Sequence, residues 1–452
     1  MNPLIPTERW DNAALFRLLW PLIVEQILNV TIGIADTVMV STVGETAVSG
    51  VSLVDAINVL LVIAFGALAT GGSVVVSQYI GRKDPKNASR ASKQLMYVSV
   101  FVSLIIMGFA LCTYRVLLRL IYGELAPEVL SAAETYFWLS ALSYPFLAVY
   151  NAAASLFRSM GNSRITMLVA LLVNGLNIFG NGLLIFGFHL GVAGAAIATL
   201  VSRAAAAAVL SCLLLSRRTG PVSLVGLSKI HLDPAMMRRI LNVGIPSGFE
   251  NSLFQIGKLL VARLVSTFGT AAIAANAVTS SIGSCIYMPG QGFGMAILTI
   301  VGQCVGARDY GGAKTYTKKL MVAAYSVLVC TNLLIFLFME PLIRCFSLSP
   351  EAHDLTWRFL TIHGIASSLA WPLSFALPNA LRAAGDARYC MIVAIVSMFT
   401  VRITLSYVLA FTVGLGSLGV WIGMGGDFLV RGTCYTWRWL RGRWQDKDLI
   451  KS

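Results

Sequence analysis

Long apolar stretches separated by short polar breaks dominate the pattern of residues along this chain. Each stretch is about 20 residues or longer, which is enough for an α-helix to cross the hydrocarbon core of a bilayer. The pattern predicts about twelve membrane-spanning helices, at residues 15–42, 48–78, 93–117, 131–156, 165–188, 191–216, 239–267, 272–303, 317–342, 355–381, 389–412 and 416–440. We therefore expect an all-α integral membrane protein.

The same pattern occurs twice along the chain. The segment that begins at Pro21 returns at Pro246, and the segment 78–84 returns at 303–309 with the same offset of 225. One gapless register over this span indicates two copies of one unit. Because each copy holds six crossings, the copies are parallel and related by a pseudo-two-fold axis along the membrane normal.

The repeat also predicts the organisation of the chain. Residues 1–216 form an N-lobe of six transmembrane helices, residues 217–237 form a polar cytoplasmic linker, and residues 238–452 form a C-lobe of six helices with a cytoplasmic tail. Repeated halves of this kind usually flank a substrate path in membrane transporters. We expect a monomer.

Composition agrees with a membrane location. Hydrophobic residues make up 57% of the chain and charged residues 12%, against about 25% charged in soluble domains. The net charge of +14 does not indicate nucleic-acid binding, because the basic residues gather in every second loop, at 82–93, 158–164, 217–239, 308–319, 382–388 and the tail 441–447. This is the positive-inside pattern, with both termini cytoplasmic.

Motifs for catalysis or cofactor binding are missing from the sequence. The eight cysteines are scattered without a CxxC pair, the four histidines lie far apart, and no Gly-Lys-Ser/Thr phosphate loop is present. We therefore predict neither an enzyme nor a cofactor, and no ATP-driven step. The N-terminus also lacks a cleavable signal pattern, so the first helix is expected to be retained.

Polar side chains within the predicted spans are the candidates for function, since charge in the membrane is costly and usually functional. Asp36 lies in the first span, where it could exchange a proton or hold a dehydrated sodium ion. Asn174, Asn177 and Asn181 share one face of the fifth span, because their spacings are three, four and seven residues. Thr199 in the sixth span could add a hydroxyl. The alternative for the asparagines is that they only join helices by amide hydrogen bonds.

Glu25 and Glu250 occupy the same place in the two copies, four residues after Pro21 and Pro246. A proline frees a carbonyl one turn back, so these places could be kinked. The glutamates either brace the helices there or form a second titrating pair, and bracing is favoured.

The second copy also carries intramembrane charges: Lys258, Arg263, Arg402 and Asp427. Basic groups at that depth need partners. We expect an interhelical ion pair between Arg402 and Asp427, and Glu250 to help neutralise Lys258. A structural role is favoured over a gate whose salt bridges change between states.

With these features together, the chain resembles the multidrug and toxic compound extrusion (MATE) family over residues 10–440. The resemblance rests on Asp36-Thr37, on the loop motifs at 78–84 and 303–309, on Arg158…Gly161 with Arg382…Asp386, and on the segment 191–199. It implies two six-helix lobes around a central cavity. It also implies antiport, in which an organic and often cationic drug leaves as sodium ions or protons enter.

The resemblance implies a cation-coupling site at Asp36, Asn177, Asn181 and Thr199, with sodium held at the first three if sodium is the coupling ion. This chain has Asn181 where many prokaryotic members have an aspartate. It has Phe254 where members with a C-lobe site carry an acid, and no acid within 367–380. Coupling is therefore expected in the N-lobe, with protons slightly favoured, and a substituting role for Glu250 stays open.

Two other functions are compatible with parts of this pattern. A lipid-linked oligosaccharide flippase of the related exporter superfamily would use a strongly cationic cavity, and Lys258, Arg263 and Arg402 leave that alternative open. A membrane-embedded enzyme or receptor-like scaffold is disfavoured by the duplicated architecture. Drug susceptibility of cells that express the chain would separate these classes. The compact loops favour a bacterial plasma membrane.

Overall fold

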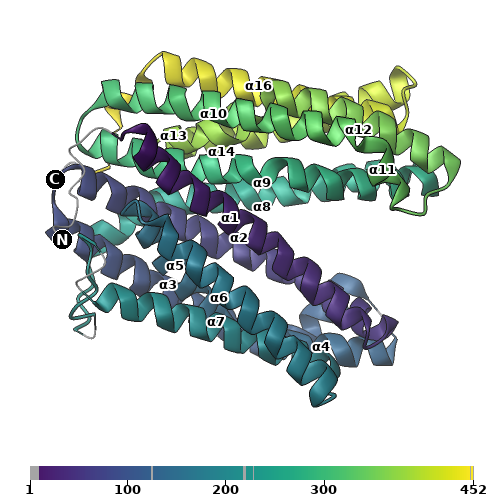
Figure 1. Cartoon of the computed structure of the whole chain (residues 1–452), viewed down its shortest axis with the longest axis horizontal. Helices are drawn as coiled ribbons and strands as arrows, with labels where there is room; N and C mark the ends of the chain where they lie inside the picture. Colours follow the sequence, from purple (N-terminus) through teal and green to yellow (C-terminus); the bar gives the residue numbers. More distant parts are fainter. Residues whose placement is uncertain (1–9, 124–125, 217–219, 228, 448, 451–452) are drawn as a thin grey trace. The chain divides into compact units, whose positions relative to one another are not determined.

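The structure is a computed structural model that describes residues 10–123, 126–216, 220–227, 229–447 and 449–450. Within these residues it consists of helices, most of them joined by short turns, and contains no β-strand (Figure 1). Two compact units are present, residues 1–248 and residues 249–452. Helix α8 (Pro234–Ser266) begins in the first unit and ends in the second.

The helices of the first unit follow the predicted spans closely. They are α1 (Asn12–Ser41), α2 (Glu45–Gly81), α3 (Pro85–Tyr122), α4 (Pro127–Leu142), α5 (Tyr144–Ser159), α6 (Ser163–Asn181), the π-helical segment η1 (Gly182–Gly187) and α7 (Gly191–Leu215). Helix α1 packs along α6, and α2 packs against α4 and α5. A buried apolar core lies among α2, α4, α5 and their neighbours, with Phe137 and Tyr144 at its centre.

The second unit repeats this order after α8. Its elements are α9 (Thr270–Gly306), α10 (Tyr310–Leu337), α11 (Met339–Arg344), α12 (Pro350–Trp371), η2 (Pro372–Ala376), α13 (Leu377–Ala383), α14 (Ala387–Val396), η3 (Ser397–Ile403), α15 (Thr404–Tyr407), η4 (Val408–Thr412), α16 (Ser417–Leu440) and η5 (Arg443–Asp446). Elements α12 to α13 form one rod, and α14 to η4 form another, because the π-helical segments join them without a break.

The predicted set of twelve spans is confirmed as helical. Among the described residues, nine helices are long and apolar enough to cross a membrane. The other three predicted spans differ for visible reasons. The span 131–156 is divided at Ser143 into α4 and α5, while α8 and α16 each carry several charged residues along their length.

The repeated loop motif has a structural cause. Asp84 and Asp309 are the N-caps of α3 and α10, and each carboxylate accepts a backbone N–H three residues later. The residue before each aspartate is left-handed, with φ of 60° at Lys83 and 59° at Arg308. An N-cap aspartate satisfies an unpaired donor of the first helical turn. The motif therefore encodes the same tight turn in both units.

The described part of the predicted linker packs on α3. Gln94 donates to the carbonyl of His231 at 2.6 Å, and Tyr97 donates to the carbonyl of Leu227 at 2.7 Å. Parts of the predicted N-lobe, linker and C-terminal tail lie outside the described residues, at 1–9, 124–125, 217–219, 228, 448 and 451–452. The predicted lobe limits follow the repeat register and stay a prediction.

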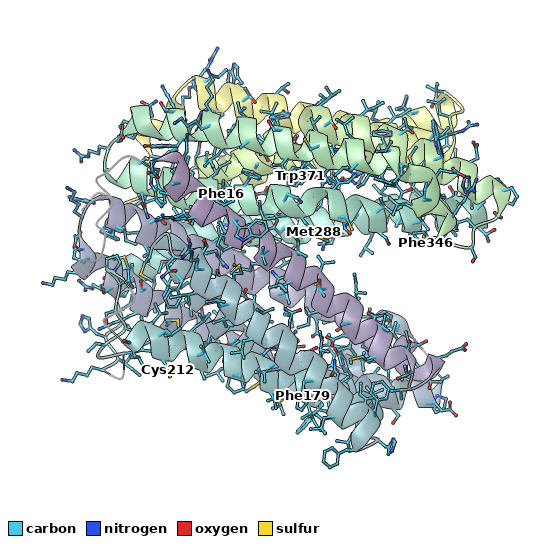
Figure 2. All side chains as sticks on the ribbon, in the orientation of Figure 1. Phe16, Phe179, Cys212, Met288, Phe346 and Trp371 are labelled. Carbon is cyan, nitrogen blue, oxygen red and sulfur yellow. The ribbon has the colours of Figure 1, made fainter. Side chains whose placement is uncertain are left out.

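Large apolar side chains cover the outer faces of the helices, as Figure 2 shows for Phe179 on α6. Phe179 is 70% exposed, whereas the asparagines at its neighbouring helical positions 177 and 181 are fully buried. Apolar residues outside and polar residues inside reverse the usual arrangement of a soluble helix. A lipid environment explains this pattern, since hydrocarbon tails can cover the apolar faces.

Candidate functional site

The first unit brings together four of the predicted coupling residues, which we call the Asp36 network: Asp36, Asn177, Asn181 and Thr199. The side-chain amide of Asn181 donates to Asp36 Oδ1 at 2.5 Å and to Asn177 Oδ1 at 3.2 Å. Asn177 donates in turn to Thr199 Oγ1 at 3.2 Å. The network thereby joins α1, α6 and α7.

Burial within the network is uneven. Asn177 and Asn181 are fully buried, whereas Asp36 and Thr199 are half-buried. The Asn181 Oδ1 atom has no hydrogen-bond partner among the described residues. A buried oxygen without a donor is costly unless a further group or ion contacts it. The network therefore offers an open carboxylate edge and an available amide oxygen at one place.

Asn174 does not join this network. Its side chain donates to the carbonyl of Ala170 in the same helix at 2.8 Å, and its Oδ1 atom has no partner among the described residues. The shared helical face was predicted correctly from the spacing, but Asn174 lies one turn closer to the start of α6 than Asn177. It is 5% exposed, so it is a buried polar residue beside the network and not part of it.

A second carboxylate, Asp55 on α2, lies in the same unit and was not among the residues expected from the sequence. Asn58 donates to it at 3.2 Å, and Tyr136 hydrogen bonds to it. Asp36 and Arg203 are both close enough to interact with it electrostatically. Asp55 and Arg203 lie in predicted spans, so the rule that singled out Asp36 could have found both.

Arg203 on α7 supplies the positive charge of this region. Its guanidinium donates to Ser143 Oγ at 2.7 Å, at the junction of α4 and α5. Two carboxylates, Asp36 and Asp55, therefore share one arginine. The surplus of negative charge suits a cation or a proton, since like charges in a low-dielectric site favour neutralisation.

Glu25 and Glu250 each bind an arginine from the equivalent helix end of their own unit. Glu25 contacts Arg158 at 2.7 Å, and Glu250 contacts Arg382 at 2.7 Å. Both glutamates are buried. These buried ion pairs agree with a role of the two glutamates in bracing their helices. They also mean that Glu250 neutralises Arg382 and not Lys258, contrary to the sequence expectation, because Arg382 at the end of α13 lies in direct contact.

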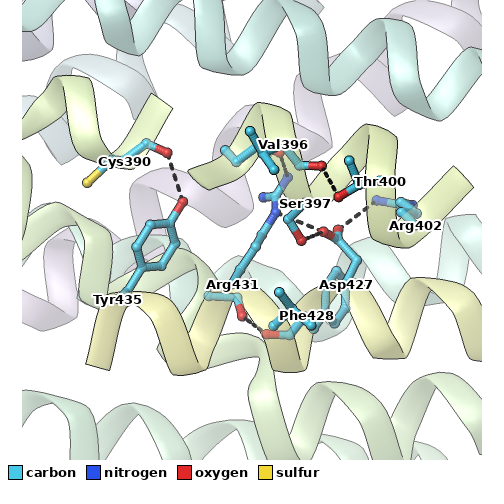
Figure 3. Close-up of polar contacts among 12 residues, drawn as sticks. Cys390, Val396, Ser397, Thr400, Arg402, Asp427, Phe428, Arg431 and Tyr435 are labelled. Carbon is cyan, nitrogen blue, oxygen red and sulfur yellow. Dashed lines mark hydrogen bonds and ion pairs between the residues drawn. The ribbon is translucent and has the colours of Figure 1, made fainter. Parts of the chain in front are cut away.

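The second unit contains a group that we call the arginine cluster: Arg402, Asp427 and Arg431 (Figure 3). Arg431 Nε lies 3.1 Å from Asp427 Oδ1, and Ser397 donates to the same oxygen at 2.5 Å. Arg402 Nη1 lies 3.8 Å from Asp427 Oδ2. The expected pair of Arg402 and Asp427 is therefore present as a long contact, and Arg431, not foreseen from the sequence, is the closer partner.

Lys258 lies apart from any acid. It makes no ion pair with a described residue, and its charged neighbour is Arg402. Arg263, on the same helix, is exposed. Phe254, one turn before Lys258, contacts the guanidiniums of both Arg402 and Arg431, whose Cζ atoms lie 5.4 Å and 5.1 Å from its ring centroid. The two arginines thus share one phenyl ring.

Comparison with known proteins places this chain among membrane transporters. The family model MatE matches residues 21–183 and again residues 246–408, once in each predicted copy. The chain is 27% identical to the uncharacterized transporter YisQ of Bacillus subtilis, over 96% of each chain. It is 28% identical to the probable multidrug resistance protein NorM of Thermotoga maritima, over 96% of this chain and 94% of that one.

Solved structures show the same fold. An outward-facing conformation of a multidrug resistance MATE family transporter superposes with a TM-score of 0.89 at 21% identity, covering 96% of each chain. A MOP superfamily transporter from Pyrococcus furiosus, described as having a binding pocket of reverse polarity, gives a TM-score of 0.88 at 21% identity, again with 96% of each chain covered.

Proposed function

Because this chain belongs to the MatE family of membrane transporters, we propose that it exports organic, often cationic, compounds in exchange for an inward-moving cation. The relatives named as probable multidrug resistance proteins support this substrate class. They favour it over the lipid-linked oligosaccharide flippase. The proposed location is a bacterial plasma membrane, with both termini in the cytoplasm as the basic loops indicate.

The observation that carries the proposal is the hydrogen bond from Asn181 to Asp36 at 2.5 Å, inside a network of buried amides. A carboxylate held by one donor keeps its second oxygen available. A proton could bind there directly. A sodium ion would need several oxygens, and Asp36, Asn177 and Asn181 supply the oxygen ligands that hard cations prefer. We take protons as the first candidate and sodium as the alternative.

The proposed cycle uses Asp36 as a switch. Ionised Asp36 meets the outer medium and accepts the cation, which removes its negative charge and changes the contacts among α1, α6 and α7. Drug release outward accompanies that change. Drug arriving from the cytoplasm then favours release of the cation inside, as the reciprocity of two coupled ligands requires. Aromatic side chains would contact cationic drugs through their ring faces.

The test is ethidium transport in proteoliposomes, with a pH gradient and a sodium gradient imposed separately. Wild type should follow one gradient, which names the coupling ion. Asp36→Asn should lose at least about 10-fold of gradient-driven transport, because the neutral amide cannot change charge. The matched control is Asp354→Asn, which removes an exposed carboxylate from an i,i+4 surface pair and should transport as wild type does.

Two results would contradict the proposal. Full gradient-driven transport by Asp36→Asn would move coupling away from the Asp36 network. If neither gradient drives transport of any cationic dye by a correctly folded wild type, the export function itself is wrong, and the flippase becomes the better explanation.

A further inference from the structure

Arg402 is a buried cation whose hydrogen-bonding groups are incompletely used. Its side chain is 4% exposed, yet Nε and Nη1 have no hydrogen-bond partner among the described residues. The contact from Nη1 to Asp427 Oδ2, at 3.8 Å, is too long for a hydrogen bond. Unpaired donors of a buried guanidinium cost free energy, so this place favours an acceptor that is not part of the chain.

The local charge balance also favours a negatively charged ligand. Arg402 and Arg431 both contact one carboxylate, Asp427, whose Oδ1 is already used by Arg431 and Ser397. Lys258 lies beside Arg402 without an acid partner among the described residues. Glu250 cannot compensate them because it is bound to Arg382 at 2.7 Å. The region therefore holds two more positive charges than negative charges, and an incoming anion would balance one of them.

The edge of this region is exposed, although Arg402 Nε and Nη1 are themselves buried. Lys258 is exposed although it lies at the edge of the α8 face that carries Glu250 and Phe254, and Arg402 lies next to it in the interior. Arg402 belongs to the π-helical segment η3, a departure from regular helix that is frequent at functional sites. Lys258 would meet a ligand first and Arg402 would hold its charged group.

Aromatic rings surround the cations. Phe254 contacts both guanidiniums, and Tyr287 is an electrostatic neighbour of Arg402 that stacks on Trp371 with ring centroids 5.2 Å apart. A planar guanidinium binds a carboxylate through two parallel hydrogen bonds from one edge, either Nε with Nη2 or Nη1 with Nη2, a geometry that a halide cannot reproduce. Each of these edges of Arg402 includes one donor without a partner among the described residues. The rings suit a flat apolar body attached to that carboxylate.

We propose that Arg402 and Lys258 form a binding site for the carboxylate of an aromatic organic acid, within the second unit. The site is separate from the Asp36 network and does not depend on which cation drives transport. The competing explanation is structural: a water molecule bridges Arg402 and Asp427, and the cluster only joins α16 to the η3 rod.

The experiment is isothermal titration calorimetry on the purified full chain in detergent, at constant pH and ionic strength, with benzoate as the probe. Benzamide, which has the same ring without the charge, and chloride are the comparison ligands. Wild type should bind benzoate saturably and bind benzamide and chloride at least about 10-fold more weakly. Lys258→Gln should weaken benzoate binding about 10- to 100-fold, the usual effect of losing one charge-assisted contact.

Arg263→Gln is the matched control, because it removes one positive charge from an exposed position of the same helix and should bind benzoate as wild type does. Arg402→Lys keeps the charge but loses the parallel N–H donors of the guanidinium, and should weaken benzoate binding by a similar factor. Lys258 is exposed, so Lys258→Gln decides the question even if Arg402→Lys does not fold.

The proposal is overturned if wild type shows no saturable benzoate binding, or if Lys258→Gln binds benzoate as tightly as wild type. Equal binding of benzamide or chloride would also overturn it, since the carboxylate would then not be what the site recognises. Each of these results leaves the bridging water as the explanation of the cluster and leaves the export function untouched.

Discussion

The two units have the same helix order but opposite polar interiors. In the first unit, Asp36 and Asp55 share one arginine and several buried amides. In the second, Arg402 and Arg431 share one aspartate, Asp427, and Lys258 lies next to Arg402 without an acid partner among the described residues. Position 261, which corresponds to Asp36 at the repeat offset of 225, is a valine. The two copies therefore share one scaffold, but the interior of the first suits a cation or a proton and the interior of the second suits an anion.

A single inserted residue accompanies this difference. The offset between equivalent residues of the two copies is 225 at Pro21 and Pro246 and 224 at Arg158 and Arg382. After these arginines it is 225 again. Gly194 and Gly419 correspond at the offset of 225, and each packs its backbone against a leucine, Leu184 or Leu409, at that same offset. The extra residue of the second copy therefore falls between 382 and 409.

The π-helical segment η3 (Ser397–Ile403) lies in that interval, and Arg402 is part of it. One added residue in a helix is accommodated by a wider π-turn. In the first unit the corresponding part of α6 is regular helix and carries Asn177. A small change in length and the change of polar side chains therefore occurred at the same place.

The largest expected effect comes from breaking the repeated ion pairs. Arg382→Met should destabilise the protein by about 3–5 kcal/mol, because it leaves the buried carboxylate of Glu250 without a partner. Arg158→Met should cost about 1 kcal/mol less, since Thr166 still donates to Glu25 at 2.7 Å. Unfolding of both variants in detergent by denaturant titration would measure the difference. Equal losses would show that the threonine contributes nothing.

The next effect separates the two aspartates. Asp427→Asn should cost about 2–4 kcal/mol, because two buried arginines lose their carboxylate. Asp36→Asn should change the free energy of unfolding by less than about 1 kcal/mol, since Asp36 is half-buried and makes no ion pair among the described residues. The same titration checks both. A larger loss for Asp36→Asn would make Asp36 a structural residue and weaken its assignment to coupling.

Much of the fold could be predicted from the sequence because apolar length and repeat register are strong signals. All twelve predicted spans are helical, and the repeated motif at Asp84 and Asp309 is explained by two equivalent N-caps. The division at Ser143 and the π-helical segments were not predicted. They change the path of a helix without changing its hydrophobicity, so no apolar pattern records them.

The polar sites were predicted less completely. The spacing of Asn177 and Asn181 correctly predicted that their side chains are neighbours, because residues four apart lie on the same face of a helix. The partners across helices, such as Arg158 for Glu25 and Arg431 for Asp427, depend on how rods pack and could not be ranked from one sequence. Asn174 shows the limit of spacing: it lies on the predicted face but one turn away from the hydrogen-bonded group.

The smallest expected effect concerns one hydroxyl that differs between the copies. Thr166 donates to Glu25 Oε2 at 2.7 Å, whereas the corresponding residue of the second copy is Cys390, and Glu250 Oε2 has no partner among the described residues. The side chains of Thr166 and Cys390 are both fully buried. Cys390→Thr replaces a thiol that donates weakly to the carbonyl of Pro378 by a β-branched side chain of similar volume, and adds a stronger donor near the unpaired carboxylate oxygen of Glu250. It should stabilise the protein by about 0.5–1.5 kcal/mol, the net value of one hydrogen bond.

The reverse exchange, Thr166→Cys, is the matched control and should destabilise by a similar amount, because a thiol is a weak donor. Denaturant titration of the two single variants and the double variant measures both effects, and the double variant should lie close to wild type because the sites are in different units. If Cys390→Thr were destabilising, the hydroxyl would not replace what the thiol contributes at this buried site, and the two copies would differ in packing or hydration instead of in this hydrogen bond. That outcome would leave the Glu–Arg pair as the element that the duplication kept, and the residue at positions 166 and 390 as free to vary.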